Sequence, residues 1–208
     1  MISRRLRSLP IWVCLVSLAA LTACSEGSPR LPRLGPGDIV LAFGDSLTYG
    51  TGAREAESYP AVLAELIGRQ VVSAGVPGER SAEGLERLAD VLDAHQPRIM
   101  LLCLGGNDML RKVDADQTEA NLRRMIEMAT GRGVGVVLIG VPKPALLAGT
   151  APFYERIAEE YAIPYEGEVL NDILRNNAYK SDPIHPNASG YRVLATALAD
   201  LLRRSGAI

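Results

Sequence analysis

Short apolar runs recur along the chain, separated by residues that end regular structure. Four of them have the length of strands, and glycine or proline follows each one: Ile39–Phe43, Gln70–Ala74, Arg98–Leu104 and Val134–Val141. A continuous apolar run of this length is typical of a strand that is covered on both faces. A shorter run at residues 163–165 predicts a fifth strand.

Amphipathic stretches lie between these runs and predict helices, because their apolar positions recur with the helical period. Several also carry the residues that begin or end helices. Helices are expected over Pro60–Gly68, over Ser81–His95, after a capping box formed by Asp116 and Glu119, over Pro152–Tyr161, and after Asn187 as an amino-terminal cap.

Strands and helices therefore alternate from Asp38 to the end of the chain. This alternation predicts an α/β fold with a parallel central sheet of about five strands and helices on both faces. The sequence contains no internal repeat and no sign of a second domain. We predict a single domain over residues 38–208.

The first residues follow a different pattern. Arg4, Arg5 and Arg7 precede an apolar segment, Leu9–Leu21, which small residues follow. Basic residues before a short apolar core are typical of a secretory signal peptide, and the core is too short to span a membrane as a helix. We predict a signal peptide over residues 1–23.

The segment Leu21-Thr22-Ala23-Cys24 resembles the lipobox of bacterial lipoproteins. The resemblance implies a lipid on Cys24 that anchors the protein in the bacterial cell envelope, on the periplasmic face; Ser25 is similar to the outer-membrane sorting preference of Gram-negative lipoproteins. A plain signal peptide with an Ala-x-Ala-like cleavage site is the alternative. The prolines and glycines of residues 25–37 favour a flexible tether, so residues 24–37 would link the anchor to the domain.

Composition narrows the class of function. The 208 residues are 48% apolar with a net charge of −2, and the pI is near 5.8. Because no basic tract is present, this balance argues against nucleic acid as a partner. The cysteines, Cys14, Cys24 and Cys103, offer no disulfide framework, and Cys103 in its apolar run is expected to be a small buried hydrophobic residue.

A serine follows the first predicted strand, in Gly44-Asp45-Ser46. Open α/β sheets bind ligands at the carboxyl ends of their strands, although Gly-Asp-Ser is also an ordinary turn. Serine needs a neighbouring base to become a nucleophile. His95 ends a predicted helix and is expected to be solvated, whereas His185 lies in a proline-rich loop three residues after Asp182. This spacing predicts that Asp182 orients His185, which takes the proton of Ser46.

Two glycine-rich loops end the second and third predicted strands, at the same sheet edge as Ser46. They read Gly75-x-x-Gly78 and Gly105-Gly106-Asn107-Asp108. Glycine exposes its backbone N–H and asparagine offers a side-chain donor, so together with the Ser46 N–H they would form an oxyanion hole. Taken singly, each loop is also explained as a tight turn that needs positive φ.

These motifs, taken in order, resemble the four blocks of the GDSL, or SGNH, hydrolases: Gly44-Asp45-Ser46-Leu47, Gly75-x-x-Gly78, Gly105-Gly106-Asn107-Asp108 and Asp182-x-x-His185. The resemblance covers essentially all of residues 38–208 and is closest to the bacterial arylesterase, lysophospholipase and thioesterase I group. It implies a flavodoxin-like, three-layer α/β/α fold. It also implies no metal or organic cofactor, and a site composed of the catalytic residues Ser46, Asp182 and His185 and the oxyanion donors Ser46, Gly78 and Asn107.

Three positions depart from the family pattern. Ser73 stands where the second block usually has asparagine, Pro77 where it usually has serine, and Pro183 where glycine is common before the histidine. The prolines are expected to stiffen their loops. Thr48 takes the place of the second glycine in a Gly-x-Ser-x-Gly elbow, which argues against an α/β-hydrolase.

The predicted reaction is hydrolysis of a small acyl-ester substrate through an acyl-enzyme, with aryl, acyl or lysophospholipid esters or thioesters as the substrate class. An O-acetylesterase acting on envelope carbohydrate is the alternative, and a non-catalytic envelope binding protein is a more distant one. The loop Lys143–Pro152 is expected to shape the acyl pocket, unless its apolar residues pack against helices instead.

Overall fold

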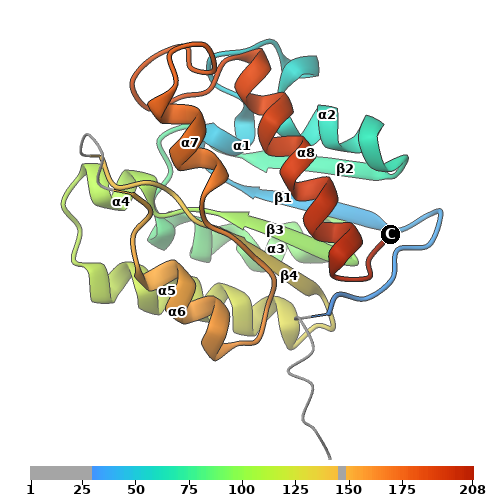
Figure 1. Cartoon of the computed structure of the whole chain (residues 1–208). Coiled ribbons are helices and arrows are strands. Elements are labelled where there is room, and N and C mark those ends of the chain that lie inside the picture. Colours follow the sequence, from blue (N-terminus) through green and yellow to red (C-terminus); the bar gives the residue numbers. More distant parts are fainter. Residues whose placement is uncertain (1–29, 145–148) are drawn as a thin grey trace, which may run out of the picture.

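The computed structural model describes residues 30–144 and 149–208, which form a five-stranded parallel sheet between two layers of helices (Figure 1). This confirms the predicted α/β class. The strands lie in the order β2-β1-β3-β4-β5. Their bounds are Ile39–Gly44 for β1, Gln70–Gly75 for β2, Ile99–Cys103 for β3, Gly135–Ile139 for β4 and Tyr165–Glu166 for β5.

The strand order creates one natural site for a ligand. From β1 the chain passes outward to β2 and then returns to β3 on the other side of β1. Connections that leave in opposite directions open a crevice at the carboxyl ends of β1 and β3, which is where flavodoxin-like sheets bind their ligands. Ser46 follows β1 and Asn107 follows β3, so both lie at this switch point.

Helices cover both faces of the sheet (Figure 1). One layer contains α2, α7 and α8, which pack on one another, and the other contains α3, α5 and α6. Short elements at the carboxyl edge complete the fold. The bounds are Ser46–Tyr49 for α1, Glu55–Glu57 for the 3-10 helix η1, Tyr59–Ile67 for α2, Ser81–His95 for α3, Gly106–Leu110 for α4, Ala115–Thr130 for α5, Phe153–Glu160 for α6, Val169–Arg175 for α7 and Ala188–Arg204 for α8.

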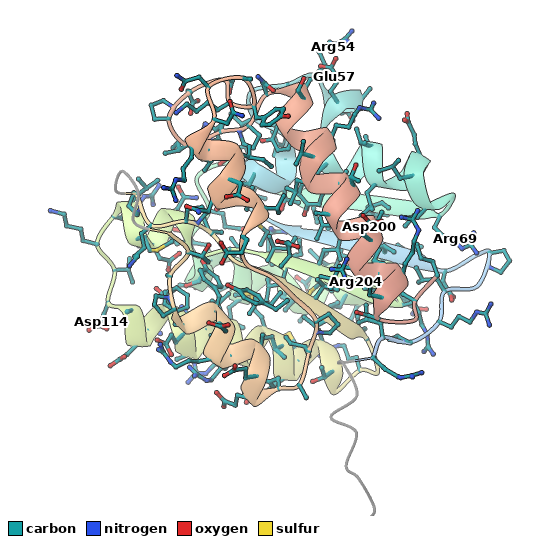
Figure 2. The ribbon with its side chains drawn as sticks, in the orientation of Figure 1. Arg54, Glu57, Arg69, Asp114, Asp200 and Arg204 are labelled. Carbon is teal, nitrogen blue, oxygen red and sulfur yellow. The ribbon has the colours of Figure 1, made fainter. Side chains whose placement is uncertain are left out.

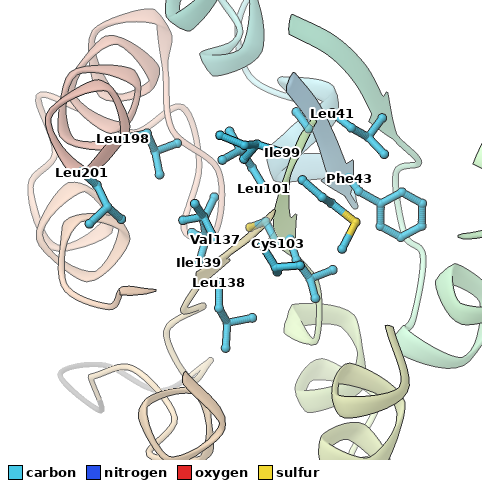
Figure 3. Close-up of a cluster of buried hydrophobic side chains, with 14 of the residues drawn as sticks. Leu41, Phe43, Ile99, Leu101, Cys103, Val137, Leu138, Ile139, Leu198 and Leu201 are labelled. Carbon is cyan, nitrogen blue, oxygen red and sulfur yellow. The ribbon is translucent and has the colours of Figure 1, made fainter. Parts of the chain in front are cut away.

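The core lies on both sides of the central strands. All five residues of β3 are fully buried, and Figure 3 shows buried side chains of β1, β3, β4 and α8 in this core, with Leu41 and Phe43 on the side away from α8. Cys103 is one of them, a free cysteine within the core, as expected from the sequence. Burial of this kind stabilises a fold by about 1.5–3 kcal/mol for each large apolar side chain. The rigid core therefore fixes the carboxyl ends of the strands.

Some predicted details are wrong. The amino-terminal cap of α5 is Asp114, whose carboxylate accepts from the Asp116 N–H, rather than a capping box at Asp116. The fifth strand starts only at Tyr165. The short helices α1, α4 and α7 were not predicted, because four to seven residues are too few for a helical period to be recognised.

Part of the segment that was predicted to be a flexible tether is packed on the domain. Leu31 and Leu34 are buried, and their N–H groups donate to the carbonyls of Ser205 and Ala207 at the end of the chain. Two apolar residues spaced three apart among prolines and glycines anchor this segment on the domain. The ordered domain therefore includes residues 31–37, which corrects the boundary at residue 38.

The signal peptide and Cys24 lie outside the described residues. Within residues 30–144 and 149–208, no helix has the length and apolar character that crossing a membrane requires.

Candidate active site

Ser46 is held at the point where β1 becomes α1. Asp45 caps the short helix, its carboxylate accepting from the Leu47 N–H at 3.0 Å, and Ser46 is the first helical residue. The Ser46 N–H therefore has no partner inside the helix. The same turn places Ser46 in the lining of a cavity.

The structure brings together Ser46, His185 and Asp182, which are far apart in the sequence. The Ser46 Oγ lies 3.0 Å from the His185 Nε2, and the His185 Nδ1 lies 2.7 Å from the Asp182 Oδ2. These are hydrogen-bond distances. A hydroxyl bonded to one nitrogen of an imidazole, whose other nitrogen bonds a carboxylate, is the arrangement of a serine nucleophile with its base.

Asp182 is fixed by more than its histidine. Its other oxygen, Oδ1, accepts from the N–H groups of Ile184 and His185, both at 2.9 Å. Partial burial raises the pKa of Asp182, but the bonds from the His185 ring and from these N–H groups outweigh it and hold the pKa below its ordinary value. Asp182 therefore stays ionised and keeps His185 in one orientation.

The loop that carries His185 is itself tied down. The Ser181 N–H donates to the His185 carbonyl, the Asn187 N–H donates to the Tyr179 carbonyl, and the Asn187 side chain caps α8 through the Gly190 N–H. These bonds confirm Asn187 as the predicted cap. Because they close the loop at its base, the imidazole is presented by a rigid support.

Gly52 allows the serine turn to approach this loop. It has φ of +100°, and a Cβ at this position would collide with the Ser181 Oγ and the Pro186 carbonyl oxygen. Any other residue would therefore push the two loops apart. Nothing in the sequence pattern singled out Gly52, because the contact involves residues about 130 positions away.

Two residues that line the cavity, Ser46 and Gly78, have backbone N–H groups without an acceptor in the described part of the chain. Gly78 has φ of +81°, as the predicted tight turn requires, and it lines the cavity with Ser46. No group in the described part of the chain accepts from the Gly78 N–H. The N–H groups of Ser46 and Gly78 are thus available to an oxyanion.

Asn107 lies beside them but is already bonded. Its Nδ2 donates to the Asp45 Oδ2 at 3.1 Å and to the Glu79 carbonyl at 3.0 Å. Both amide hydrogens therefore have acceptors. The two bonds fix the amide plane at the cavity wall, between the serine turn and the Gly78 loop.

Asp45 is a buried carboxyl group directly behind the nucleophile. It is only 2% exposed and accepts from the Leu47 N–H and the Asn107 amide. Burial raises the pKa of Asp45 to about 7, with a further contribution from the nearby charge of Glu79, and its hydrogen bonds oppose the rise. Asp45 therefore fixes the local loop and links the first and third motifs.

A second buried carboxylate joins the two donor loops. Asp108 accepts from the Ser81 N–H at 2.8 Å and from the Ser81 hydroxyl at 2.6 Å, and the Asn121 amide donates to the same hydroxyl. Asp108 follows Asn107, and Ser81 lies three residues after Gly78. This network therefore sets the distance between the two loops. Ser81 and Asn121 were not predicted as site residues.

An ion pair supports the Gly78 loop from behind. Glu79, nearly buried, pairs with Arg87 at 2.5 Å, and the Arg87 Nη2 donates to the Ala74 carbonyl at the end of β2. The Arg87 guanidinium also lies 4.1 Å from the centroid of the Phe43 ring. This contact binds the second motif to β1 and β2, and the sequence offered no signal for it.

The cavity in front of Ser46 has a volume of about 770 Å³. Its wall is largely apolar, and the ionisable side chains on it other than Asp45 and His185 are all basic. The apolar lining comprises Leu47, Pro77, Leu110, Val141, Pro142, Pro144, Leu174, Pro183 and Ile184, and the basic lining comprises Lys143, Arg175 and Lys180. Of the predicted pocket loop, Lys143 and Pro144 line the cavity, whereas residues 145–148 lie outside the described part.

The other candidate groups lie elsewhere. His95 ends α3 at the opposite edge of the sheet, away from the cavity. Ser73 donates to the Thr48 carbonyl at 3.3 Å and does not line the cavity. Within the described ranges, no three His, Cys, Asp or Glu side chains are grouped so as to hold a metal ion.

Comparison with known sequences agrees with this geometry. The model of the GDSL-like Lipase/Acylhydrolase family matches residues 42–193. Thioesterase 1/protease 1/lysophospholipase L1 of Escherichia coli (strain K12) is 30% identical over 179 residues, which are 82% of this chain and 86% of the relative. The arylesterase of Vibrio mimicus is 31% identical over 145 residues, which are 67% of this chain and 65% of the relative.

Two solved structures also superimpose on most of this chain. The crystal structure of TesA superimposes with a TM-score of 0.73 at 25% identity, over 80% of this chain and 98% of that one. AlinE4, an SGNH-hydrolase family esterase, superimposes with a TM-score of 0.63 at 31% identity, over 83% of this chain and 98% of that one.

Proposed function

Because this chain belongs to the GDSL-like lipase/acylhydrolase family and is a serine carboxylic ester hydrolase, we propose that it acts through an acyl-enzyme on Ser46. The observation that carries the proposal is the chain of hydrogen bonds from Ser46 through His185 to Asp182. The free N–H groups of Ser46 and Gly78 at the same cavity support it, since the reaction develops negative charge on an oxygen there.

In the first half of the reaction, the Ser46 Oγ attacks the ester carbonyl carbon while its proton passes to the His185 Nε2. Asp182 stabilises the imidazolium that forms and keeps its Nδ1–H directed inward. The tetrahedral intermediate then collapses, and the proton on Nε2 is given to the leaving alcohol or thiol. In the second half, water attacks the carbonyl carbon of the acyl-enzyme while one proton of the water passes to the His185 Nε2. The second tetrahedral intermediate then collapses, His185 returns this proton to the Ser46 Oγ, and the carboxylic acid leaves.

The oxyanion is bound by the N–H groups of Ser46 and Gly78, with Asn107 as a third donor. In the structure the Asn107 amide donates to Asp45 and to the Glu79 carbonyl. An oxyanion at the cavity wall competes with the neutral Glu79 carbonyl for one hydrogen, and a charged acceptor forms the stronger bond. The hydrogen bond from Asn107 to the substrate oxygen therefore becomes stronger as negative charge develops on that oxygen. An interaction that is stronger in the transition state than in the ground state lowers the barrier.

The lining of the cavity supports acyl esters or thioesters as the substrate class. Leu110, Val141 and Ile184 are part of a wall that extends beyond what an acetyl group would occupy. Relatives with an esterase, thioesterase or lysophospholipase name match most of this chain. These observations favour a longer acyl group over an acetyl ester of carbohydrate.

The proposal extends to the place where the enzyme acts. The arginines, apolar core and Cys24 of the leader support a lipoprotein of the bacterial cell envelope, attached through its amino-terminal cysteine. Metabolic labelling with a palmitate analogue tests this, because the label should be lost in Cys24→Ser.

Replacement of Ser46 tests the proposed mechanism. A series of p-nitrophenyl esters from acetate to palmitate, alongside an acetylated sugar, would be assayed with the wild type and with Ser46→Ala. Turnover should favour the longer chains and should vanish in the variant, whose circular dichroism should be unchanged. Ser189, exposed at the start of α8, is the matched control, and Ser189→Ala should keep full activity. Turnover by Ser46→Ala would refute the assignment.

A further inference from the structure

The wall of the catalytic cavity carries three cations. Lys143, Arg175 and Lys180 line it, and none of them forms an ion pair with the described residues. Other surface arginines do have a carboxylate partner, as Arg54 has Glu57 at the top of Figure 2. A cation without a carboxylate partner is free to pair with the anionic group of a ligand.

Few carboxyl groups oppose these cations. Asp45 is the one carboxyl group in the described lining, and it is only 2% exposed. Asp182 is bonded through both oxygens, to the ring of the catalytic histidine and to two backbone N–H groups. Glu166, Glu168 and Asp172 lie before or in α7 but outside the lining, and none of them pairs with a cation of the wall. The wall itself therefore carries a net positive charge.

The helix α7 adds a polar side chain without a partner. Asn171, Leu174 and Arg175 share one face of α7, because they are three or four residues apart, and all three line the cavity. Asn171 is only 8% exposed, yet its amide has no hydrogen-bond partner among the described residues. The amide is not sealed in, since the Arg69 Nε is the one fully enclosed side-chain atom without a partner in the described structure. A ligand in the cavity can therefore satisfy this amide.

Two of the cations lie on the side of the cavity that the leaving group occupies. Lys180 forms an antiparallel bridge with Pro186, the residue after His185. The Lys180 Nζ donates to the Leu174 carbonyl at 3.1 Å, which holds it at the last turn of α7 beside Arg175 and leaves two of its three N–H groups free. In the proposed mechanism the His185 Nε2 protonates the leaving oxygen. The leaving alcohol therefore lies beside this loop.

We propose that Asn171, Arg175 and Lys180 bind a phosphate group carried by the leaving alcohol, an inference that rests on the proposed function. A guanidinium, an ammonium and an amide N–H together suit the oxygens of a phosphate, and the apolar lining takes the acyl chain. Hydrolysis breaks only the acyl C–O bond. The acid takes the hydroxyl of water, and the alcohol leaves with the other hydrogen and with its phosphate ester intact. The enzyme is thereby selective for acyl esters of phosphorylated alcohols over those of neutral alcohols.

A matched pair of esters tests the subsite. Monooctanoyl glycerophosphate and monooctanoyl glycerol contain the same reacting ester and differ only in the phosphate. Release of octanoic acid would be measured below the micellar concentration with the wild type, with Arg175→Gln/Lys180→Gln and with the control Arg98→Gln/Arg204→Gln. The control removes the same charge at the opposite edge of the sheet, where Arg98 precedes β3 and Arg204 ends α8 (Figure 2).

The wild type and the control should have a higher kcat/KM for the phosphate ester than for the neutral one. In Arg175→Gln/Lys180→Gln the ratio of the two values should fall by about 10- to 100-fold, since hydrogen bonds to charged groups contribute on that order. Asn171→Leu, which keeps the size of the side chain but not its donor, should lower the ratio by about 10-fold. A general disturbance of α7 would instead slow both reactions and leave the ratio unchanged.

Binding separates this proposal from the proposed function. Ser46→Ala should bind monooctanoyl glycerophosphate without turnover, and adding Arg175→Gln/Lys180→Gln should raise its Kd by about 10- to 100-fold, as measured by isothermal titration calorimetry. Hydrolysis of monooctanoyl glycerol by the wild type reports the proposed function alone. An unchanged kcat/KM ratio together with an unchanged Kd in the variants of Arg175 and Lys180, or an equal fall of the ratio in the control, would overturn the phosphate subsite.

Discussion

Replacement of Asp45 by asparagine should change how the free energy of unfolding depends on pH, because Asp45 is a buried carboxyl group behind Ser46. The introduced amide would keep the size of the side chain and the acceptor for the Leu47 N–H, but it cannot ionise. Burial raises the pKa of Asp45 from 3.8 to about 7 in the folded protein. Between these values the folded state holds a proton that the unfolded chain has released, so the free energy of unfolding falls as the pH rises.

The size of this effect follows from the two pKa values. A rise from 3.8 to about 7 corresponds to about 4 kcal/mol in total. Of this, about 3 kcal/mol is lost between about pH 5 and pH 8, and no further change occurs above the folded pKa. The free energy of unfolding of Asp45→Asn, relative to the wild type, should therefore rise by about 3 kcal/mol over this interval.

Urea unfolding followed by far-ultraviolet circular dichroism at pH 5 and pH 8 measures this difference. Comparing the two proteins cancels every other titrating group to first order. Asp90→Asn, at an exposed aspartate of α3, is the matched control and should show the same pH dependence as the wild type. A difference between Asp45→Asn and the wild type that stays constant with pH would refute the argument from burial.

Asn107→Ala should lower kcat by on the order of 10²–10³ with little change in KM, because one oxyanion donor is lost; an effect on KM alone would contradict this role. Asp182→Asn should lower kcat by on the order of 10⁴ while the fold is retained, since the histidine loses the carboxylate that sets its tautomer; near-normal turnover would show that His185 needs no partner. Asp108→Ala should destabilise the protein by about 3 kcal/mol, because the buried Ser81 N–H and hydroxyl lose their acceptor, and should lower kcat more than it changes KM; an unchanged melting temperature would show that the Ser81 bonds do not stabilise the fold. Gly52→Ala should lower kcat by separating Ser46 from His185, which a crystal structure of the variant would show as a longer Oγ–Nε2 distance.

The fold could be predicted well because its signals are local. The apolar runs of β1 to β4 and the amphipathic pattern of α3 each lie within one window of the sequence, and the structure confirms them. Short elements were missed for the same reason, since α4 has only five residues. The segment after Arg30 was expected to be flexible because its composition is rich in proline and glycine. Leu31 and Leu34 instead hold it on the end of the chain after α8, through a contact that no local pattern contains.

The residues of the site divide in the same way, into those that lie in local motifs and those that act through contacts between distant segments. Ser46, Asp182 and His185 could be predicted because each lies in a motif with recognisable spacing, and the structure places them in contact. The groups that hold the Gly78 and Asn107 loops in place were not found. Ser81 and Arg87 act through contacts between distant segments, and both are ordinary helix residues in the sequence. Supporting networks of this kind are visible only once the chain is folded.

Mass spectrometry of the protein after reaction with a fluorophosphonate tests the central claim most directly. The account predicts one covalent adduct, on the peptide that contains Ser46, and no adduct in Ser46→Ala or after unfolding in urea. Labelling of His185→Ala should be far slower, because the serine would have lost its base. An adduct on any other residue, or equal labelling of the folded and the unfolded protein, would contradict the assignment of Ser46 as an activated nucleophile.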